Sequence, residues 1–388
     1  MDWHAEEASW SDCDFDIFHY NQCRSVVIRI NRKPDSDPTF EKDELRDNIE
    51  WQDWLDNEPS ANFTESGLYL VLCSRASPIL EGTDAPVSYI SIHRNTWERL
   101  TRTFHIHREI RRPISRGVDY FTSYYDTGKG SESKIYFVAR MSASLPGDLA
   151  VSLTYVPSKD TTFAVIYGCN EDQMVDIERR VKGAKDKTQY PLLMIGLLAE
   201  LERERLLAEA EELVDDFTLR DDYFNESTKI AADINNEKTQ EYVKLCFRSR
   251  LLMHHIKAVK HQLSKLVAEI DKFAVEGKMT CRFNKYGTLM KKRILDIIDE
   301  YKVKINECKM IVEDTTLATQ TAIFSMDMFD WSPKTGGSVV SNYIWVFAVF
   351  AIGLTAITFL VWYYTSSFTS RYTKSLETDV SGAQGKLV

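Results

Sequence analysis

The hydrophobic pattern of the chain changes near residue 168, which divides it into two regions of different character. Upstream of that point, short runs of β-branched and aromatic residues alternate with polar stretches, and residues 91–104 carry apolar side chains at helical spacing. Runs of this kind are typical of β-strands. We expect strands at residues 23–31, 68–73, 120–125, 134–141, 149–156 and 161–167. Residues 1–168 are therefore predicted to form an N-terminal α/β domain.

From residue 169 to residue 314 the apolar residues follow a helical period with few interruptions. Polar breaks occur near residues 185–190, 220–236 and 277–287, so we expect several long helices. One helix spaces its apolar residues alternately four and three apart, which is the seam of a left-handed coiled coil. This seam contains Leu252, Ile256, Val259, Leu263, Leu266, Ile270 and Phe273. The region is predicted to be a helical bundle with a long coiled-coil stalk.

The helix that follows the last break has apolar residues on two sides. One row, at the same spacing, contains Met290, Ile294, Ile297, Tyr301, Lys304, Cys308 and Ile311. A neighbouring row contains Leu295, Ile298, Ile305 and Val312. A helix can bury one such row against a hairpin partner, but the second row needs another neighbour. A second copy of the chain would cover it, and so would the α/β domain in a monomeric bundle.

An uncharged run of 22 residues, 343–364, lies near the C-terminus. As a helix it would be about 33 Å long, which is enough to cross a hydrocarbon core of about 30 Å. Trp345 and Trp362 lie near its two ends, where aromatic residues favour the headgroup boundary. We predict a transmembrane helix at 343–364, preceded by a loop at 330–342 and followed by a polar tail at 365–388.

A shorter uncharged run precedes this span, and it bears on how often the chain crosses the membrane. Residues 315–326 would form a helix of about 18 Å, too short to cross a bilayer alone. Arg371, Lys374 and Lys386 follow the span and place the tail in the cytoplasm. The N-terminal domain, which shows no secretory signal, is expected there too. Both ends lie on one side only if a short first membrane segment at 315–329 also crosses or enters the membrane.

Composition narrows the class of protein. The net charge is −10, and it lies upstream of residue 320 because the charges after that residue cancel. An acidic body repels nucleic acid and can concentrate cations. The seven cysteines include no C-x-x-C pair, which argues against a disulfide framework or a zinc site and fits a reducing compartment. We expect an integral membrane protein with most of its mass in the cytosol and no nucleic-acid partner.

The sequence contains no pattern for an enzyme active site. Gly128-Lys129 lacks both the spacing of a phosphate loop and the Ser or Thr that should follow its lysine. His105 and His107 could place two imidazoles on one strand face, but no third ligand is spaced to complete a metal site. We therefore assign these histidines a structural or surface role. Neither enzymatic activity nor a bound cofactor is expected.

Two stretches resemble the CorA family of divalent-cation channels. They are residues 191–205, PLLMIGLLAELERER, and residues 323–331, IFSMDMFDW, of which the second is the more specific. The order of the parts is also similar to that of the family: an α/β domain, a long stalk helix, a first membrane helix with a Met-bearing loop, and a second membrane helix. Members from filamentous fungi are the most similar. The resemblance covers most of the chain and implies an α+β membrane protein that assembles as a homopentamer.

The loop after the first membrane helix reads Gly-Met-Asn in the family, or Ser-Met-Asn in many fungal members, and five copies of it form the pore mouth. Here it reads Ser325-Met326-Asp327. The resemblance makes these three residues the pore-mouth loop, with a ring of carboxylates where the family has amides. The first membrane helix is also shorter than in the family pattern.

In the family, acidic residues of the stalk helix hold regulatory cations between subunits. By analogy Asp296, Asp299 and Glu300 are candidates, and a solvated helix face is the alternative. The resemblance thus implies a divalent-cation transporter subunit that conducts magnesium passively through a homo-oligomeric pore, with the lipid bilayer as a further partner. The alternative function is a non-conducting membrane-anchored coiled-coil protein with a degenerate pore, acting as an interaction scaffold.

Overall fold

The computed structural model describes residues 10–32, 37–57, 66–75, 87, 89–126, 133–143, 145–226, 231–275, 281–325 and 352. The chain divides into two compact units. The first comprises Met1–Tyr223 and Lys244–Glu313, and it holds a β-sheet domain together with most of the long helices. The second comprises Phe224–Val243 and Asp314–Val388, whose described residues are the ends of three helices and Ile352.

Seven strands of the first unit form one mixed sheet in the order β3-β2-β4-β9-β8-β7-β6. Their bounds are β2 Ser25–Arg32, β3 Thr39–Leu45, β4 Ser66–Ser74, β6 Tyr120–Asp126, β7 Lys134–Arg140, β8 Ala150–Val156 and β9 Thr161–Cys169. Neighbouring strands are antiparallel except β4 and β9, which run parallel. All six strands predicted from the sequence are confirmed.

The sequence does not predict the edge strand β3, because its residues TFEKDEL are mostly charged. Ion pairs attach it to its neighbour: Arg29 Nη2 lies 2.9 Å from Asp43 Oδ2, and Arg24 Nη2 lies 3.0 Å from Glu44 Oε1. Charged side chains on an edge strand also oppose pairing with the sheet of another molecule. Outside the main sheet, β1 (His19–Tyr20) and β5 (Tyr89–Ile90) form a short parallel pair.

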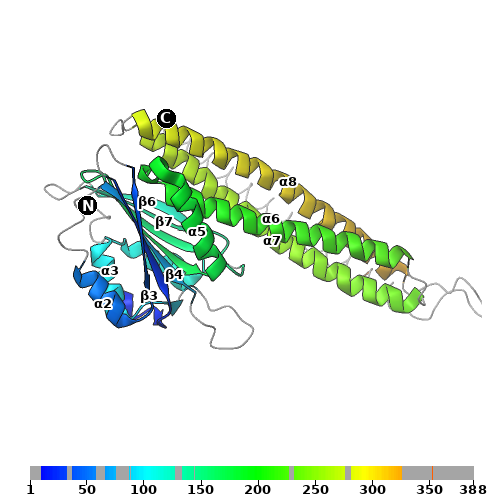
Figure 1. The fold of residues 1–388 in the computed structure, drawn as a ribbon. Helices are drawn as coiled ribbons and strands as arrows, with labels where there is room; N and C mark the ends of the chain where they lie inside the picture. The colour runs from blue at the N-terminus through cyan, green and yellow to red at the C-terminus, as the bar shows by residue number, and fades with distance from the viewer. Residues whose placement is uncertain are drawn as a thin grey trace, which may run out of the picture. The chain divides into compact units, whose positions relative to one another are not determined.

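Aromatic side chains fill the core between one face of the sheet and helices α2 and α3 (Figure 1). Trp97 of α3 is fully buried, and its ring lies edge-on to that of Tyr167 in β9 with the centroids 5.5 Å apart. The helix predicted at residues 91–104 is confirmed as α3. The helices on this side are α1 Asp12–Phe15, α2 Asn48–Asn57, α3 Arg94–Thr103, η1 Arg108–Ile110 and α4 Arg111–Arg116.

The opposite face of the sheet is also buried. Ile28, Leu70 and Ile166 point away from the aromatic core because side chains alternate along a strand, yet each is at most 1% exposed. Figure 1 shows α5, which spans Glu171–Ala184, on the side of the sheet away from α2 and α3. A sheet covered on both faces explains why β8 and β9 are buried along their whole length.

Three long helices follow the short helix η2 (Lys185–Gln189): α6 Leu193–Glu226, α7 Ala231–Val275 and α8 Cys281–Ser325. All seven residues of the predicted coiled-coil seam in α7 are buried, with at most 6% exposure, so the seam is confirmed. On α8, five members of the first predicted row are at most 1% exposed: Ile294, Ile297, Tyr301, Cys308 and Ile311. The seam of α7 and the first row of α8 therefore both lie inside the bundle.

Two of the three predicted breaks, near 220–236 and 277–287, are shorter than expected. α8 begins at Cys281, so Gly287 lies inside this helix rather than in a break that ends there. A Cβ atom at Gly287 would lie 3.1 Å from the hydroxyl of Tyr190, so the glycine allows close packing between α8 and the segment before α6. Packing of this kind outweighs the low helix propensity of glycine.

α8 continues without interruption from the predicted stalk region to Ser325. The predicted first membrane segment at 315–329 therefore starts as the last turns of α8. Among the described residues, no helix combines the length and the apolar character that a bilayer crossing requires. The predicted span at 343–364 lies outside the described residues apart from Ile352.

Gly67 is a position where a single methyl group should disturb the sheet. A Cβ atom there would overlap the carbonyl oxygen of Ile30 on the paired strand β2. We expect Gly67→Ala to lower the free energy of unfolding by about 1–3 kcal/mol, as overpacking does in other cores. Gly183→Ala in α5 is the matched control, because nothing lies within 4 Å of the added atom and alanine favours a helix. Urea denaturation should show opposite signs for the two variants, and equal effects would contradict this account of Gly67.

Candidate functional site

One row of α8 faces away from the bundle, and we call it the outer row: Leu289, Asp296, Val303 and Met310. Its members are seven residues apart, which is almost two helical turns, so they lie in line along the helix. The side chains of Leu289, Val303 and Met310 are 51%, 56% and 51% exposed. Large apolar side chains in such a line on one helix are typical of a surface that another helix covers.

The outer row differs from the second apolar row that the sequence predicts. Of that predicted row, Ile298 is 8% exposed and packs inside the chain, whereas Leu295 is 42% exposed. Ile305 and Val312 are half-buried. Leu295 is thus the member of the predicted row that is largely exposed on a single chain, and Val303 and Met310 of the outer row are exposed as well.

The three acidic candidates on α8 have different surroundings. Asp296 is exposed. Asp299 is exposed as well, and its carboxylate lies 2.7 Å from Lys302 Nζ on the same helix. Glu300 is half-buried and is turned toward α6, where it pairs with Arg203, and it lies 3.9 Å from Arg293.

The structure thus leaves Asp296 and Asp299 exposed on α8, whereas Glu300 is engaged by Arg203 of α6. Residues three apart on a helix are neighbours on its surface. Two carboxylates are too few for a complete divalent-cation site, which takes six or more oxygen ligands. Among the described residues, no group of three or more His, Cys, Asp or Glu side chains could hold a metal ion. A cation site here would need ligands from a second chain or from water.

The predicted pore-mouth loop lies at the limit of the described structure. Ser325 is the last residue of α8, and Met326 and Asp327 lie outside the described residues. The prediction for these three residues stays a prediction.

The histidines of the 105–107 segment have structural contacts. The buried ring of His107 stacks on Tyr124 with centroids 4.1 Å apart, and its Nδ1 accepts a hydrogen bond from the backbone N–H of Glu109. The ring of His105 lies edge-on to Phe163 with centroids 5.9 Å apart. These contacts agree with the structural role that the sequence assigns to them.

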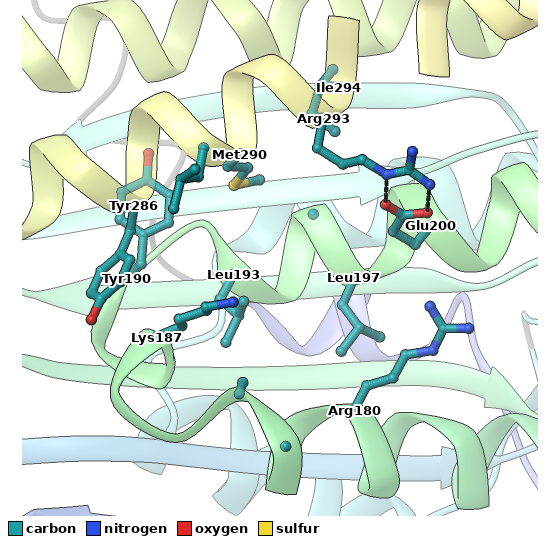
Figure 2. A pocket seen from close by; sticks show the side chains of 14 residues that line it. Arg180, Lys187, Tyr190, Leu193, Leu197, Glu200, Tyr286, Met290, Arg293 and Ile294 are labelled. Atoms are coloured by element: carbon teal, nitrogen blue, oxygen red, sulfur yellow. Dashed lines mark hydrogen bonds and ion pairs between the residues drawn. The ribbon is translucent and has the colours of Figure 1, made fainter. Parts of the chain in front are cut away.

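A pocket of about 410 Å³ opens between α5, η2, α6 and the first turns of α8 (Figure 2). The ion pair between Arg293 of α8 and Glu200 of α6 lies at one end, with Nη2 2.9 Å from Oε2. Tyr190 and Tyr286 lie at the other end. The sequence does not predict this pocket, because its wall combines residues from helices that are about 100 positions apart.

The interior of the pocket is mostly apolar. Met290 packs against Gly196, where a Cβ atom would lie only 2.6 Å from the methionine methyl group. The guanidinium of Arg180 is already engaged, since it contacts both carboxylate oxygens of Glu204 at 2.7 Å. The pocket can hold an apolar group, but it offers no set of oxygen ligands for a cation.

No family model matches the chain, and no curated protein matches it. Among solved structures, the chain is similar to the cytoplasmic domain of ZntB from Vibrio parahaemolyticus, with 10% identity and a TM-score of 0.38 over 66% of this chain and 89% of that one. It is also similar to the full-length CmaX protein, with 8% identity and a TM-score of 0.43 over 88% of this chain and 98% of that one. At these scores and identities neither likeness assigns the chain to a family.

Proposed function

We propose that the chain is one subunit of a CorA-like transporter for divalent cations, in which several copies surround a shared pore. The outer row of α8 is the observation that carries the proposal. It leaves large apolar side chains exposed on a single chain, in line with the acidic residue Asp296. Covering this row with the same helix of other copies removes apolar surface from water without any further partner.

A ring of copies would also complete the acidic site. Each chain contributes Asp296 and Asp299 to the outer side of its own α8. Several chains around one axis would multiply these carboxylates, which are hard oxygen ligands of the kind that magnesium prefers. The resemblance of Ser325-Met326-Asp327 to the family loop supports magnesium as the ion and a pentamer as the assembly, with conduction driven by the membrane potential. The proposal includes no enzymatic step and no bound cofactor.

The pore-mouth loop provides the test. Purified full-length protein in liposomes should take up magnesium, detected by an indicator dye inside the vesicles, and hexaammine-cobalt should block the uptake. Asp327→Asn should reduce the flux on the order of tenfold, because a ring of carboxylates concentrates cations at the entrance. Asp330→Asn removes the same charge three residues away and serves as the matched control. Equal flux from the two variants would contradict a pore mouth at Asp327.

The second candidate function is a non-conducting, membrane-anchored scaffold. One observation in the sequence favours it: the uncharged run at 315–326 would form a helix of only about 18 Å. A hydrocarbon core is about 30 Å thick. Protease access to Lys374 in sealed, right-side-out vesicles separates the two functions, since two crossings protect the tail and a single crossing exposes it. Absence of magnesium flux from well-folded oligomers would favour the scaffold.

A further inference from the structure

A buried carboxylate lies where the helical bundle meets the α/β domain. Glu202 of α6 is 3% exposed. Arg205, one turn along the same helix, places Nη2 2.7 Å from Oε1 and 3.0 Å from Oε2 of this carboxylate. The same guanidinium donates to Ser142 Oγ at 2.8 Å and to the carbonyl oxygen of Pro146 at 2.7 Å, both in the loop that joins β7 to β8. The guanidinium of Arg205 therefore binds both the carboxylate of Glu202 and the β7–β8 loop.

Polar groups from the other two long helices complete this junction. His255 of α7 is 3% exposed, and Tyr301 of α8 is fully buried. Among the described residues, the two ring nitrogens of His255 have no hydrogen-bond partner. The hydroxyl of Tyr301 has none there either. Both side chains are close enough to Arg205 to feel its charge. We call Glu202, Arg205, His255 and Tyr301 the junction cluster.

Burying Glu202 at the contact between α6 and the β7–β8 loop costs free energy when its carboxylate is charged. A buried carboxylate needs several donors to replace water, and here Arg205 is its only donor among the described residues. Two further acids of the α/β domain, Asp119 and Asp148, act on Glu202 with a charge of the same sign. A neutral carboxyl group at this position avoids most of this cost.

We propose that Glu202 is a proton-binding group, and that its ionisation loosens the contact between α6 and the β7–β8 loop. The attachment of the helical bundle to the α/β domain then depends on pH. No transport activity is needed for this device, so its test is independent of the function proposed for α8.

The sign of the pH dependence follows from the pKa of Glu202 in two states. In the closed junction α6 contacts the β7–β8 loop, and in the open junction this contact is broken. Burial, with Asp148 and Asp119 adding to it and Arg205 opposing it, raises the pKa of Glu202 from 4.5 to about 7 in the closed junction. In an open junction the group is hydrated and its pKa returns toward 4.5. The closed junction binds the proton more tightly, so it is favoured at low pH and opens more often as the pH rises through 7. These two values make opening about tenfold more frequent at pH 8 than at pH 6.

His255 acts in the opposite direction. Burial lowers the pKa of His255 from 6.5, so its protonation favours an open junction as the pH falls below that value. Below pH 6.5 the two titrations therefore oppose each other, so opening in the natural protein should depend less on pH than Glu202 alone would make it. His255→Asn removes the second titration, and this variant isolates the contribution of Glu202.

The experiment measures hydrogen exchange in the β7–β8 loop of the full-length protein, corrected for the intrinsic pH dependence of exchange. The backbone N–H of Leu145, which donates to the carbonyl oxygen of Ser142, is the reporter. In the His255→Asn protein, exchange should be about tenfold faster at pH 8 than at pH 6. Adding Glu202→Gln should make the rate slow and independent of pH. Adding Glu204→Gln, an exposed neighbour on the same helix, should leave the tenfold change intact.

Two results would overturn the proposal. One is a pH profile that is the same with and without Glu202→Gln. The other is an infrared titration of the unmodified protein that shows no protonated carboxyl band appearing between pH 8 and pH 5. The infrared measurement needs no variant, so it remains decisive if a substitution in the junction cluster prevents folding.

Discussion

Replacing Asp148 with alanine should lower the free energy of unfolding by about 3–5 kcal/mol, which is the usual cost of leaving a buried charge unpaired. The side chains of Asp148 and Arg140 are 5% and 4% exposed, and Arg140 Nη2 lies 2.6 Å from Asp148 Oδ2. Arg75 Nη2 lies 3.1 Å from the other carboxylate oxygen. The substitution therefore removes the carboxylate that two guanidinium groups share, and it leaves the buried charge of Arg140 without this counter-ion. Urea denaturation of the full-length protein in detergent, followed by tryptophan fluorescence, measures the loss.

An exposed ion pair provides the control for this prediction. Asp299 pairs with Lys302, and both side chains are mostly exposed. Exposed pairs contribute less than about 1 kcal/mol, so Asp299→Ala should leave the unfolding midpoint almost unchanged. If Asp148→Ala cost no more than Asp299→Ala, the buried pair would not stabilise the sheet as described.

The double variant Val303→Glu/Met310→Glu should dissociate the proposed oligomer. Each of these outer-row side chains exposes more than half of its surface on a single chain. Burying the exposed half of such a side chain contributes about 1 kcal/mol, and a charge in its place cannot be buried without a partner. Losing both contacts should weaken association by a factor on the order of 100 or more. Sedimentation velocity in detergent measures the change as a shift from oligomer to monomer, and magnesium flux should be lost with it.

Leu219→Glu is the matched control for the double variant. Leu219 is 68% exposed on α6 and does not belong to the outer row. The same charge introduced there should leave the oligomer intact. An unchanged mass distribution for the α8 variant, or equal dissociation by both substitutions, would exclude the outer row as the contact between copies.

Strands and helices that show a local period of apolar residues could be predicted from the sequence. The six strands show continuous or alternating apolar runs, and the seam of α7 repeats four and three residues apart. Both patterns involve neighbours along the chain, so they are visible without knowing the fold. The edge strand β3 lacks such a pattern, because pairing with Arg24 and Arg29 holds it in place instead.

The candidate site could be predicted from the sequence only in part. Asp296, Asp299 and Glu300 are close in the sequence, yet Glu300 pairs with Arg203 of α6 while the two aspartates are exposed. The second apolar row was also displaced, since Ile298 is buried while Val303 is exposed. The rotation of α8 about its own axis decides these exposures, and contacts with the other helices set that rotation.

The amino-acid order alone establishes an acidic α+β chain, a coiled-coil helix, and an uncharged run long enough to span a bilayer. These properties are sums or periods taken over neighbouring residues. The three-dimensional packing determines the proton-binding environment of Glu202, the buried pair at Asp148 and the exposed side of α8. Arg205 and Ser142 are 63 positions apart, as the partners of such contacts often are, and no local pattern reports which distant groups will exclude water from one another.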